Sequence, residues 1–151
     1  VVFLGRISQA ELTENQTAEL MRLMDAVNDL ENIGDVVEMN LVELGRRRIG
    51  KGVAISQPTQ VVLSDFHQVV LDAVQAAIQA VGDDDPEAAH LVTSIKKDIT
   101  RITNSAATHE AKRLVANEPQ RIEAYTVEMD IAEKLQRIYY FARRMARTVT
   151  R

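Results

Sequence analysis

Three short breaks divide the chain into long helical segments, and this division constrains its fold more than any other feature. Glycine, proline and asparagine mark the breaks at residues 50–52, 82–86 and 117–119. Between the breaks, apolar residues recur at spacings of three and four, the period of one face of an α-helix. The 151 residues hold only six glycines and three prolines, and no run of 18 residues is wholly apolar. We therefore predict an all-α fold, an antiparallel bundle of four long helices, and no membrane span.

Each predicted helix has a start signal. Thr13 and Gln16 fit a capping box that opens a helix over residues 13–48. Ser56 with the following proline opens the second helix, Asp85 with Pro86 opens the third, and the fourth begins near Pro119. Residues 1–12 resemble the end of an element whose start is missing, and residues 1–151 form one domain.

The first helix carries an apolar stripe that we expect to be its buried seam. A glycine in the stripe is expected to let a neighbouring backbone come close. A bundle that lacks further helices should also leave apolar side chains of this helix exposed, among them Met21, Met39 and Val42, and such patches usually find a partner. The predicted seam comprises Leu20, Leu23, Val27, Leu30, Gly34, Val37, Leu41 and Leu44.

Composition excludes several classes of protein. Eighteen basic against 22 acidic residues give a net charge of −4, which argues against a nucleic-acid partner. There is no cysteine, so disulfide scaffolds and thiolate zinc sites are excluded. Aromatic residues make up 4% of the chain without a tryptophan, too few for a base-stacking platform.

Three acidic residues of the first helix are candidate metal ligands. Glu31, Asp35 and Glu38 are spaced four and three apart, so an α-helix places them on one face, which Asn28 extends by a turn. Carboxylate oxygens on one face suit a hard cation. A solvated acidic surface explains the same spacing, and both interpretations stay open.

The fourth helix repeats the pattern of the first at an offset of 105 residues. Met24, Leu30 and Ile33 match Met129, Leu135 and Ile138. At the same offset, the three acids give way to neutral and basic side chains. Their counterparts are Gln136, Tyr140 and Arg143.

Residues 23–40, LMDAVNDLENIGDVVEMN, closely resemble the signature helix of the PhoU family. That signature is an acidic residue, three spacers and an aspartate, here Glu31 and Asp35. The family is built from two three-helix repeats, and the second signature should fall in the fourth helix, where Gln136 and Tyr140 replace both acids. The resemblance implies an incomplete first repeat, ending with residues 13–48, and a complete second repeat at residues 56–151.

The resemblance also implies a function. PhoU-like proteins are either free-standing regulators of phosphate uptake and signalling or the cytoplasmic C-terminal tails of bacterial sodium/phosphate cotransporters. The amino-acid sequence of residues 25–31 is more similar to those of the cotransporter tails. We therefore expect a non-enzymatic regulatory domain at the cytoplasmic side of the inner membrane. Its partners would be a membrane transporter region and further copies of this chain.

The resemblance and the residues together limit the expected cofactors. Family members with two intact signatures bind metal clusters, but this chain retains one signature. We expect no required cofactor, and at most one weakly bound divalent or iron-type ion near Glu31, Asp35 and Glu38. A metal-dependent bundle enzyme is a further alternative, although neither Glu31 nor Glu38 has the histidine three residues on that such enzymes use.

Basic residues gather where two helices end. Arg46, Arg47 and Arg48 close the first helix, and Arg143, Arg144 and Arg147 lie near the end of the last. Such residues complement the helix dipole, and they would also suit contact with an anionic membrane surface. Both interpretations remain open at this point.

Overall fold

The computed structural model describes residues 2–8, 11–114 and 120–150, with side chains left undescribed at 106 and 109–114. The described residues form helices and no strand, which confirms the all-α class. The elements are α1 (Val2–Ile7), α2 (Glu14–Asp35), the π-helix η1 (Val36–Leu41), α3 (Val42–Gly50), α4 (Gln57–Asp83), α5 (Pro86–Ser94), α6 (Lys96–Leu114) and α7 (Arg121–Val149).

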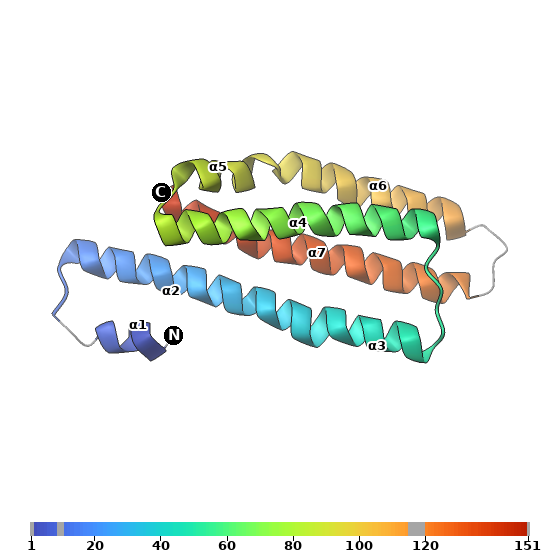
Figure 1. Cartoon of the computed structure of the whole chain (residues 1–151), viewed down its shortest axis with the longest axis horizontal. Coiled ribbons are helices and arrows are strands. Elements are labelled where there is room, and N and C mark those ends of the chain that lie inside the picture. The colour runs from blue at the N-terminus through green and yellow to red at the C-terminus, as the bar shows by residue number, and fades with distance from the viewer. Residues whose placement is uncertain (1, 9–10, 115–119, 151) are drawn as a thin grey trace.

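Helix α7 is the axis around which the other helices pack. Its most extensive contact is with α4, and α5 and α6 pack against both of these helices. The continuous segment α2–η1–α3 lies along another side of α7 and makes few contacts with α4. Successive long segments alternate in direction, and α1 lies beside the first half of α2 (Figure 1). The fold is therefore a three-helix core with a fourth long segment laid against α7.

The helix starts follow the predicted capping residues. The Thr13 hydroxyl accepts a hydrogen bond from the Gln16 main chain at 3.3 Å, and the Gln16 side chain accepts one from the Thr13 main chain at 3.0 Å. Ser56 and Asp85 accept hydrogen bonds from the first turns of α4 and α5. These three starts are confirmed. The predicted break at 117–119 lies outside the described residues.

The third predicted helix is interrupted at Ile95, where α5 ends and α6 begins. The Thr-rich stretch 100–108, whose residue types are poorer helix formers, is helical. At the break, the Tyr139 hydroxyl donates a 2.9 Å hydrogen bond to the carbonyl of Val92 in the last turn of α5. Carbonyls in a last helical turn lack helical partners, so this tyrosine stabilises the interruption.

The core lies between α4, α5–α6 and α7. Phe66, Val92 and Ile99 are its largest fully buried apolar side chains. The apolar stripe of α7 is buried in its central part, while Tyr125 and Val149 at its ends are half-buried. The buried members are Ala132, Leu135, Tyr139, Ala142 and Ala146.

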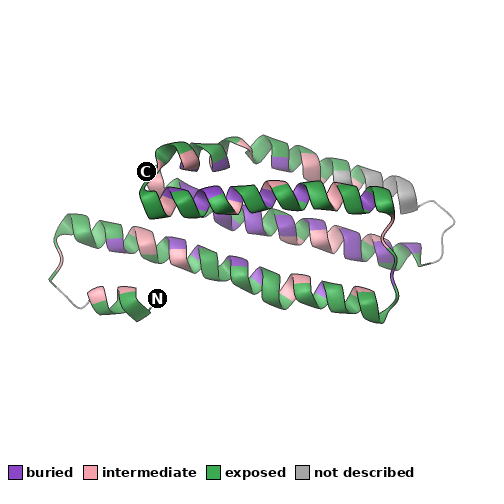
Figure 2. Ribbon diagram, in the orientation of Figure 1, coloured by how far each residue is buried: buried purple, intermediate pink, exposed green. Residues whose placement is uncertain are grey.

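The predicted seam of the first helix is wrong over its middle part. Leu30, Gly34 and Val37 are exposed, although Leu20 and Leu44 at the two ends are buried. No described atom would lie within 4 Å of a Cβ at Gly34, so no backbone of the described residues approaches it closely. The face that meets α7 lies one position earlier and is seen as the buried stripe in Figure 2. It comprises Ala26, Asp29, Ile33 and Val36.

The π-helix η1 sits where the buried face would otherwise turn away from α7. The amide of Val42 donates to the carbonyl of Val37, five residues back, which widens the turn. After Val36, the next residues toward α7 are therefore the half-buried Leu41 and the buried Leu44. The wide turn keeps α3 in contact with α7, and the sequence pattern did not predict it.

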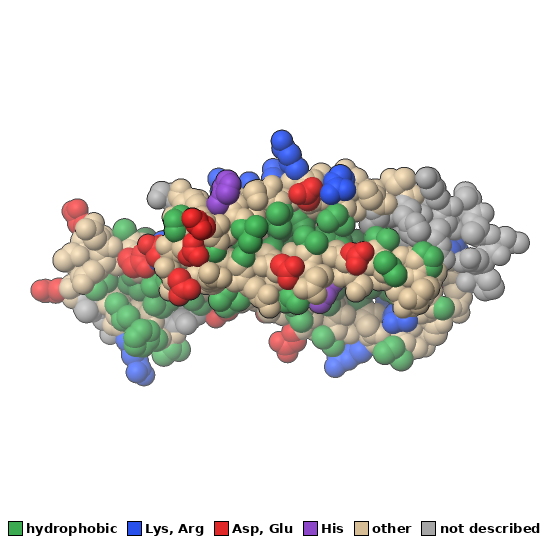
Figure 3. Space-filling view, turned by 45° about the horizontal axis from the view of Figure 1, so that its top comes forward, with side chains coloured by type: hydrophobic (Ala, Val, Ile, Leu, Met, Phe, Trp, Pro, Cys, Tyr) green, Lys and Arg blue, Asp and Glu red, His purple; other side chains and the backbone are tan. Residues whose placement is uncertain are grey.

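Helix α4 is only partly covered. Its apolar residues cover more than one face, but Val61, Leu71 and Ile78 are exposed. Figure 3 shows apolar side chains over α4 and the α5–α6 segment, with carboxylates scattered among them. Among the described helices, α4 alone is long and apolar enough to cross a membrane by length and composition, and the absence of a membrane span stays a prediction. It also packs against α5 and α7, as a core helix does.

Candidate functional site

The three predicted metal ligands lie on the segment that packs against α7, and all three are exposed. Glu31 and Asp35 belong to the last turns of α2, and Glu38 belongs to η1. Asn28 is also exposed, and its carbonyl accepts a 2.7 Å hydrogen bond from the Asn32 side chain.

The π-turn changes the spacing on which the three-ligand prediction rests. Glu38 follows Asp35 within a turn wider than an α-helical turn, so a separation of three residues does not return it to the same angular position. Glu31 and Asp35 remain within regular α-helix, four residues apart. Within the described part of the chain, no group of three or more acidic, histidine or cysteine side chains is placed to hold a metal ion. The geometry is that of two neighbouring surface carboxylates.

A buried acid that the sequence analysis missed lies on the opposite side of α2. The side chain of Asp29 is 2% exposed and faces α7, where its Oδ2 lies 3.3 Å from Nε of Arg144. Its other oxygen is buried and has no hydrogen-bond partner among the residues that the structure describes. Burial raises the pKa of Asp29, the positive charge of Arg144 lowers it, and the negative charge of Asp25 raises it, with a net upward shift.

A second ion pair ties α3 to α7 near the other end of the segment. Arg47 donates a 2.8 Å hydrogen bond to Asp130, and both side chains are about one-third exposed. Together with the Asp29–Arg144 pair it fixes the alignment of α2–η1–α3 along α7. One of the basic residues at the end of the first helix is thus paired within the fold.

A buried ion pair also lies inside α7. The Arg121 guanidinium donates a 2.8 Å hydrogen bond to the Glu128 carboxylate, two turns further along, and both side chains are almost fully buried. Buried charges are found where they are paired, so this contact belongs to the core.

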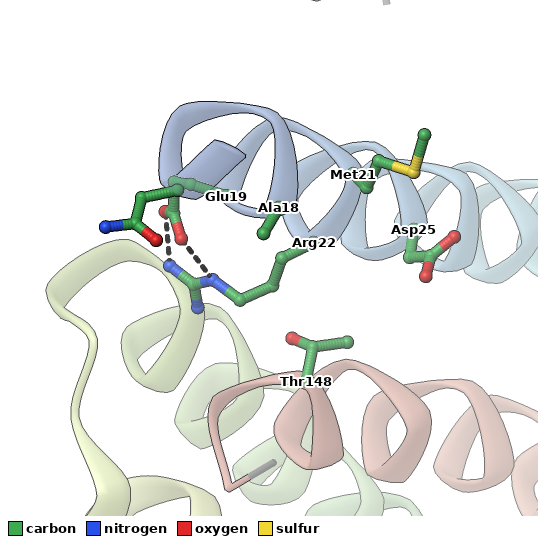
Figure 4. A pocket seen from close by; sticks show the side chains of 7 residues that line it. Ala18, Glu19, Met21, Arg22, Asp25 and Thr148 are labelled. Atoms are coloured by element: carbon green, nitrogen blue, oxygen red, sulfur yellow. Dashed lines mark hydrogen bonds and ion pairs between the residues drawn. The ribbon is translucent and has the colours of Figure 1, made fainter. Parts of the chain in front are cut away.

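A polar cavity of about 390 Å³ opens between the first half of α2 and the end of α7. Figure 4 shows Arg22 extending toward Glu19 on the α2 side, with Thr148 on the facing helix α7. The Arg22 guanidinium donates to Glu19 at 2.8 and 2.6 Å and lies 3.4 Å from Asp84 in the loop after α4. The hydrogen bond from Arg22 lowers the pKa of Glu19 despite its partial desolvation. Arg22 is thus paired with two acids, and the carboxylate of Asp25 also lines the cavity, so the described residues offer an anion no unpaired cation there.

An apolar cavity of about 370 Å³ separates α1 from α2. Leu4 and Ile7 contribute one wall, and Leu20 and Leu23 contribute the other. No residue of α1 is buried, so this short helix covers α2 loosely.

Comparison with known proteins gave no match to a model of a protein family, to a curated protein or to a solved structure. The class of protein that the described residues define is therefore an all-α domain with one long helical segment laid on a three-helix core.

Proposed function

We propose that the chain is a non-enzymatic regulatory domain of phosphate transport, namely the PhoU-like cytoplasmic tail of a sodium-dependent phosphate cotransporter. The observation that carries the proposal is the signature stretch at residues 29–35, which presents Glu31 and Asp35 to solvent from a long helix. On this proposal the four long segments are a PhoU-like antiparallel bundle. Helices α4 to α7 correspond to a complete three-helix repeat, and α2–η1–α3 corresponds to the last helix of an incomplete one.

The exposed carboxylates give this proposal a test in cells. Changing both Glu31 and Asp35 to alanine should alter the rate of labelled phosphate uptake in cells that carry the variant gene in place of the natural one. Changing Asp65 and Glu133, two other exposed acids, is the matched control and should leave uptake unchanged. Identical uptake in all three strains at both high and low phosphate would count against a role in phosphate transport.

Metal binding at this site is proposed to be weak. Two carboxylates on one helix leave most positions around a cation to water, which rarely gives tight binding. Elemental analysis should find less than one ion per chain in the purified protein and none in the Glu31→Ala/Asp35→Ala variant. The helicity of the variant should be unchanged. One tightly held ion per chain that survives the double change would refute this assignment.

Two alternatives to the cotransporter tail can be separated by single observations. A free-standing regulator of phosphate uptake and signalling has the same site, and the gene around this sequence distinguishes the two, because a tail follows a region of many apolar helices. A metal-dependent bundle enzyme would require a redox metal with open coordination positions, which spectroscopy of the metal-loaded protein would detect.

We also propose that the chain assembles with further copies of itself or with a transporter region. Met21, Met39 and Val42 were expected to be exposed, and they are 64%, 68% and 43% exposed. Leu30 and Val37 add to the apolar surface of the same segment. Light scattering at micromolar concentration should give a mass above that of one chain, and a Met39→Lys change should lower it. A monomeric mass for the unchanged protein would contradict self-assembly.

Peripheral contact with a membrane surface is proposed from the basic residues at the helix ends. Of the two clusters, Arg46 and Arg48 close α3, and Arg147 lies in the last turn of α7. Co-sedimentation with vesicles should rise with their content of anionic lipid. Binding that is the same with neutral vesicles would exclude this role.

A further inference from the structure

A small cavity between α6 and α7 is lined by two cations, and its described lining residues include no carboxylate. Its volume is about 120 Å³, enough for about four water molecules. Lys96 at the start of α6 and Arg143 in the last part of α7 provide the charges. The remaining lining residues are Ile99, Thr100, Gln136, Tyr139 and Tyr140.

Neither cation is neutralised by the described residues. All the ion pairs found in the described part of the chain leave Lys96 and Arg143 without an acidic partner. The nearest acid in sequence, Asp98, is paired with Arg101 at 3.1 Å. Two unneutralised cations at one cavity repel each other, and an anion between them would remove that repulsion.

Arg143, which lines the cavity, has a buried donor nitrogen without a partner among the described residues. Its Nε is buried and has no hydrogen-bond partner among the described residues, whereas most buried polar atoms in proteins are satisfied. Its positive charge lowers the pKa of the neighbouring Tyr139, against a larger upward effect of burial. The Tyr139 hydroxyl itself is engaged with the Val92 carbonyl. With the Tyr139 hydroxyl occupied, the unsatisfied buried donor among the described residues that line the cavity is the Nε of Arg143.

The polar neighbours complete a set of donors. The Gln136 amide and the Tyr140 hydroxyl line the same cavity, and each can donate a hydrogen bond. The Thr100 hydroxyl donates to the carbonyl of Lys96 at 3.0 Å, so it offers only an acceptor in this conformation. Charged and neutral donors that line one cavity, with no carboxylate among its described lining residues, are the chemistry of an oxyanion site.

We propose that this cavity binds a small phosphate-type oxyanion. Three of its residues, Gln136, Tyr140 and Arg143, occupy the positions that match Glu31, Asp35 and Glu38 at the offset of 105 residues. The two related helices thus carry opposite charge at equivalent positions, with acids exposed on α2–η1 and cations around a cavity on α7. The proposal rests on the cavity and its charges and does not depend on a role in phosphate transport.

Calorimetry with inorganic phosphate at low salt tests the site directly. The chain should bind phosphate saturably, and Lys96→Gln and Arg143→Gln should each weaken binding about tenfold or more, because each removes a charged hydrogen bond. Lys97→Gln is the matched control, since Lys97 is exposed on the same turn and does not line the cavity. It removes the same charge and should leave the affinity within about twofold.

A second arm distinguishes a free oxyanion from a lipid headgroup. Vesicles with phosphatidate are compared with neutral vesicles for the same four proteins, and circular dichroism verifies that each variant is folded. The site is supported if binding is lost with Lys96→Gln and kept with Lys97→Gln. The arm in which this happens, free phosphate or phosphatidate, identifies the source of the oxyanion. No saturable binding in either arm, or equal loss in the Lys97→Gln control, would overturn the proposal.

Discussion

The buried pair between Asp29 and Arg144 should respond unequally to the loss of its two partners. Asp29 is 2% exposed and Arg144 is 50% exposed. Loss of Arg144 therefore leaves a buried carboxylate without its counter-charge, whereas loss of the Asp29 charge leaves an arginine that water can solvate. If the two side chains were equally buried, removing either one would lower the stability by the same amount.

The expected magnitudes follow from this difference in burial. Removing one partner of a fully buried ion pair costs about 3–5 kcal/mol. Because half of Arg144 is already in water, Arg144→Gln should lower the free energy of unfolding by about 1–3 kcal/mol at pH 7. Asp29→Asn should change it by less than about 1 kcal/mol, since no charge remains buried. The double variant should resemble Asp29→Asn.

The raised pKa of Asp29 determines whether stability rises or falls with pH. Burial raises the pKa of Asp29 above its value in the unfolded chain, about 3.9. As pH falls, the folded state therefore takes up the proton before the unfolded state does. The Asp29 contribution to stability then increases from pH 7 down toward pH 4, and it is lost again as pH rises through the folded pKa.

Urea denaturation at pH 7 and pH 5 measures both effects. The stability of the wild type relative to Asp29→Asn should be greater at pH 5, and the deficit of Arg144→Gln should shrink there. Arg147→Gln, an exposed residue of the same helix, is the control for the loss of one positive charge. Equal costs for Asp29→Asn and Arg144→Gln, or a deficit of Arg144→Gln that does not change with pH, would refute the reasoning.

Four further changes test the fold. Tyr139→Phe leaves the Val92 carbonyl without its donor and should cost about 1–3 kcal/mol in urea denaturation, while Tyr140→Phe, at a side chain 55% exposed, should cost little. Phe66→Ala removes a fully buried ring and should cost about 3–5 kcal/mol by the same measurement; a cost below about 1 kcal/mol would contradict its place in the core. Thr13→Ala removes the cap of α2 and should cost about 1 kcal/mol, with helicity lost at that end by amide exchange. Gly34→Ala should raise the free energy of unfolding by about 0.5–1 kcal/mol, and with it the unfolding temperature, because the alanine Cβ would meet no described atom. A loss of stability would indicate a contact with another molecule at this position.

The helix starts could be predicted from sequence because they depend on few and local atoms. Thr13, Ser56 and Asp85 each form hydrogen bonds with amides of the next few residues. The stripe of α7 was also predictable, since that helix is surrounded and its apolar positions have one consistent face. The break at Ile95 was not, because it depends on a hydrogen bond from Tyr139, 47 residues away from Val92.

The candidate site was predictable only in its exposed part. Glu31 and Asp35 are separated by four residues of regular helix, which the spacing implies, and both are exposed. The place of Glu38 was less predictable, because the π-turn that carries it leaves no signal in the apolar pattern. Asp29 was overlooked since a single acid beside an apolar stripe is usually solvated.

The buried face of α2 shows why the choice between two neighbouring stripes needs the partner helix. One stripe offers Leu30 and Val37, and the other, one position earlier, offers Asp29 and Val36. Apolar content alone favours the first, but the second meets α7 where Arg144 can neutralise the aspartate. The more apolar stripe is consequently left at the surface, next to the exposed Met39. An exposed apolar stripe of this kind is typical of a surface that binds another protein. We therefore expect the assembly contact on the face of α2 and η1 that carries Leu30 and Val37.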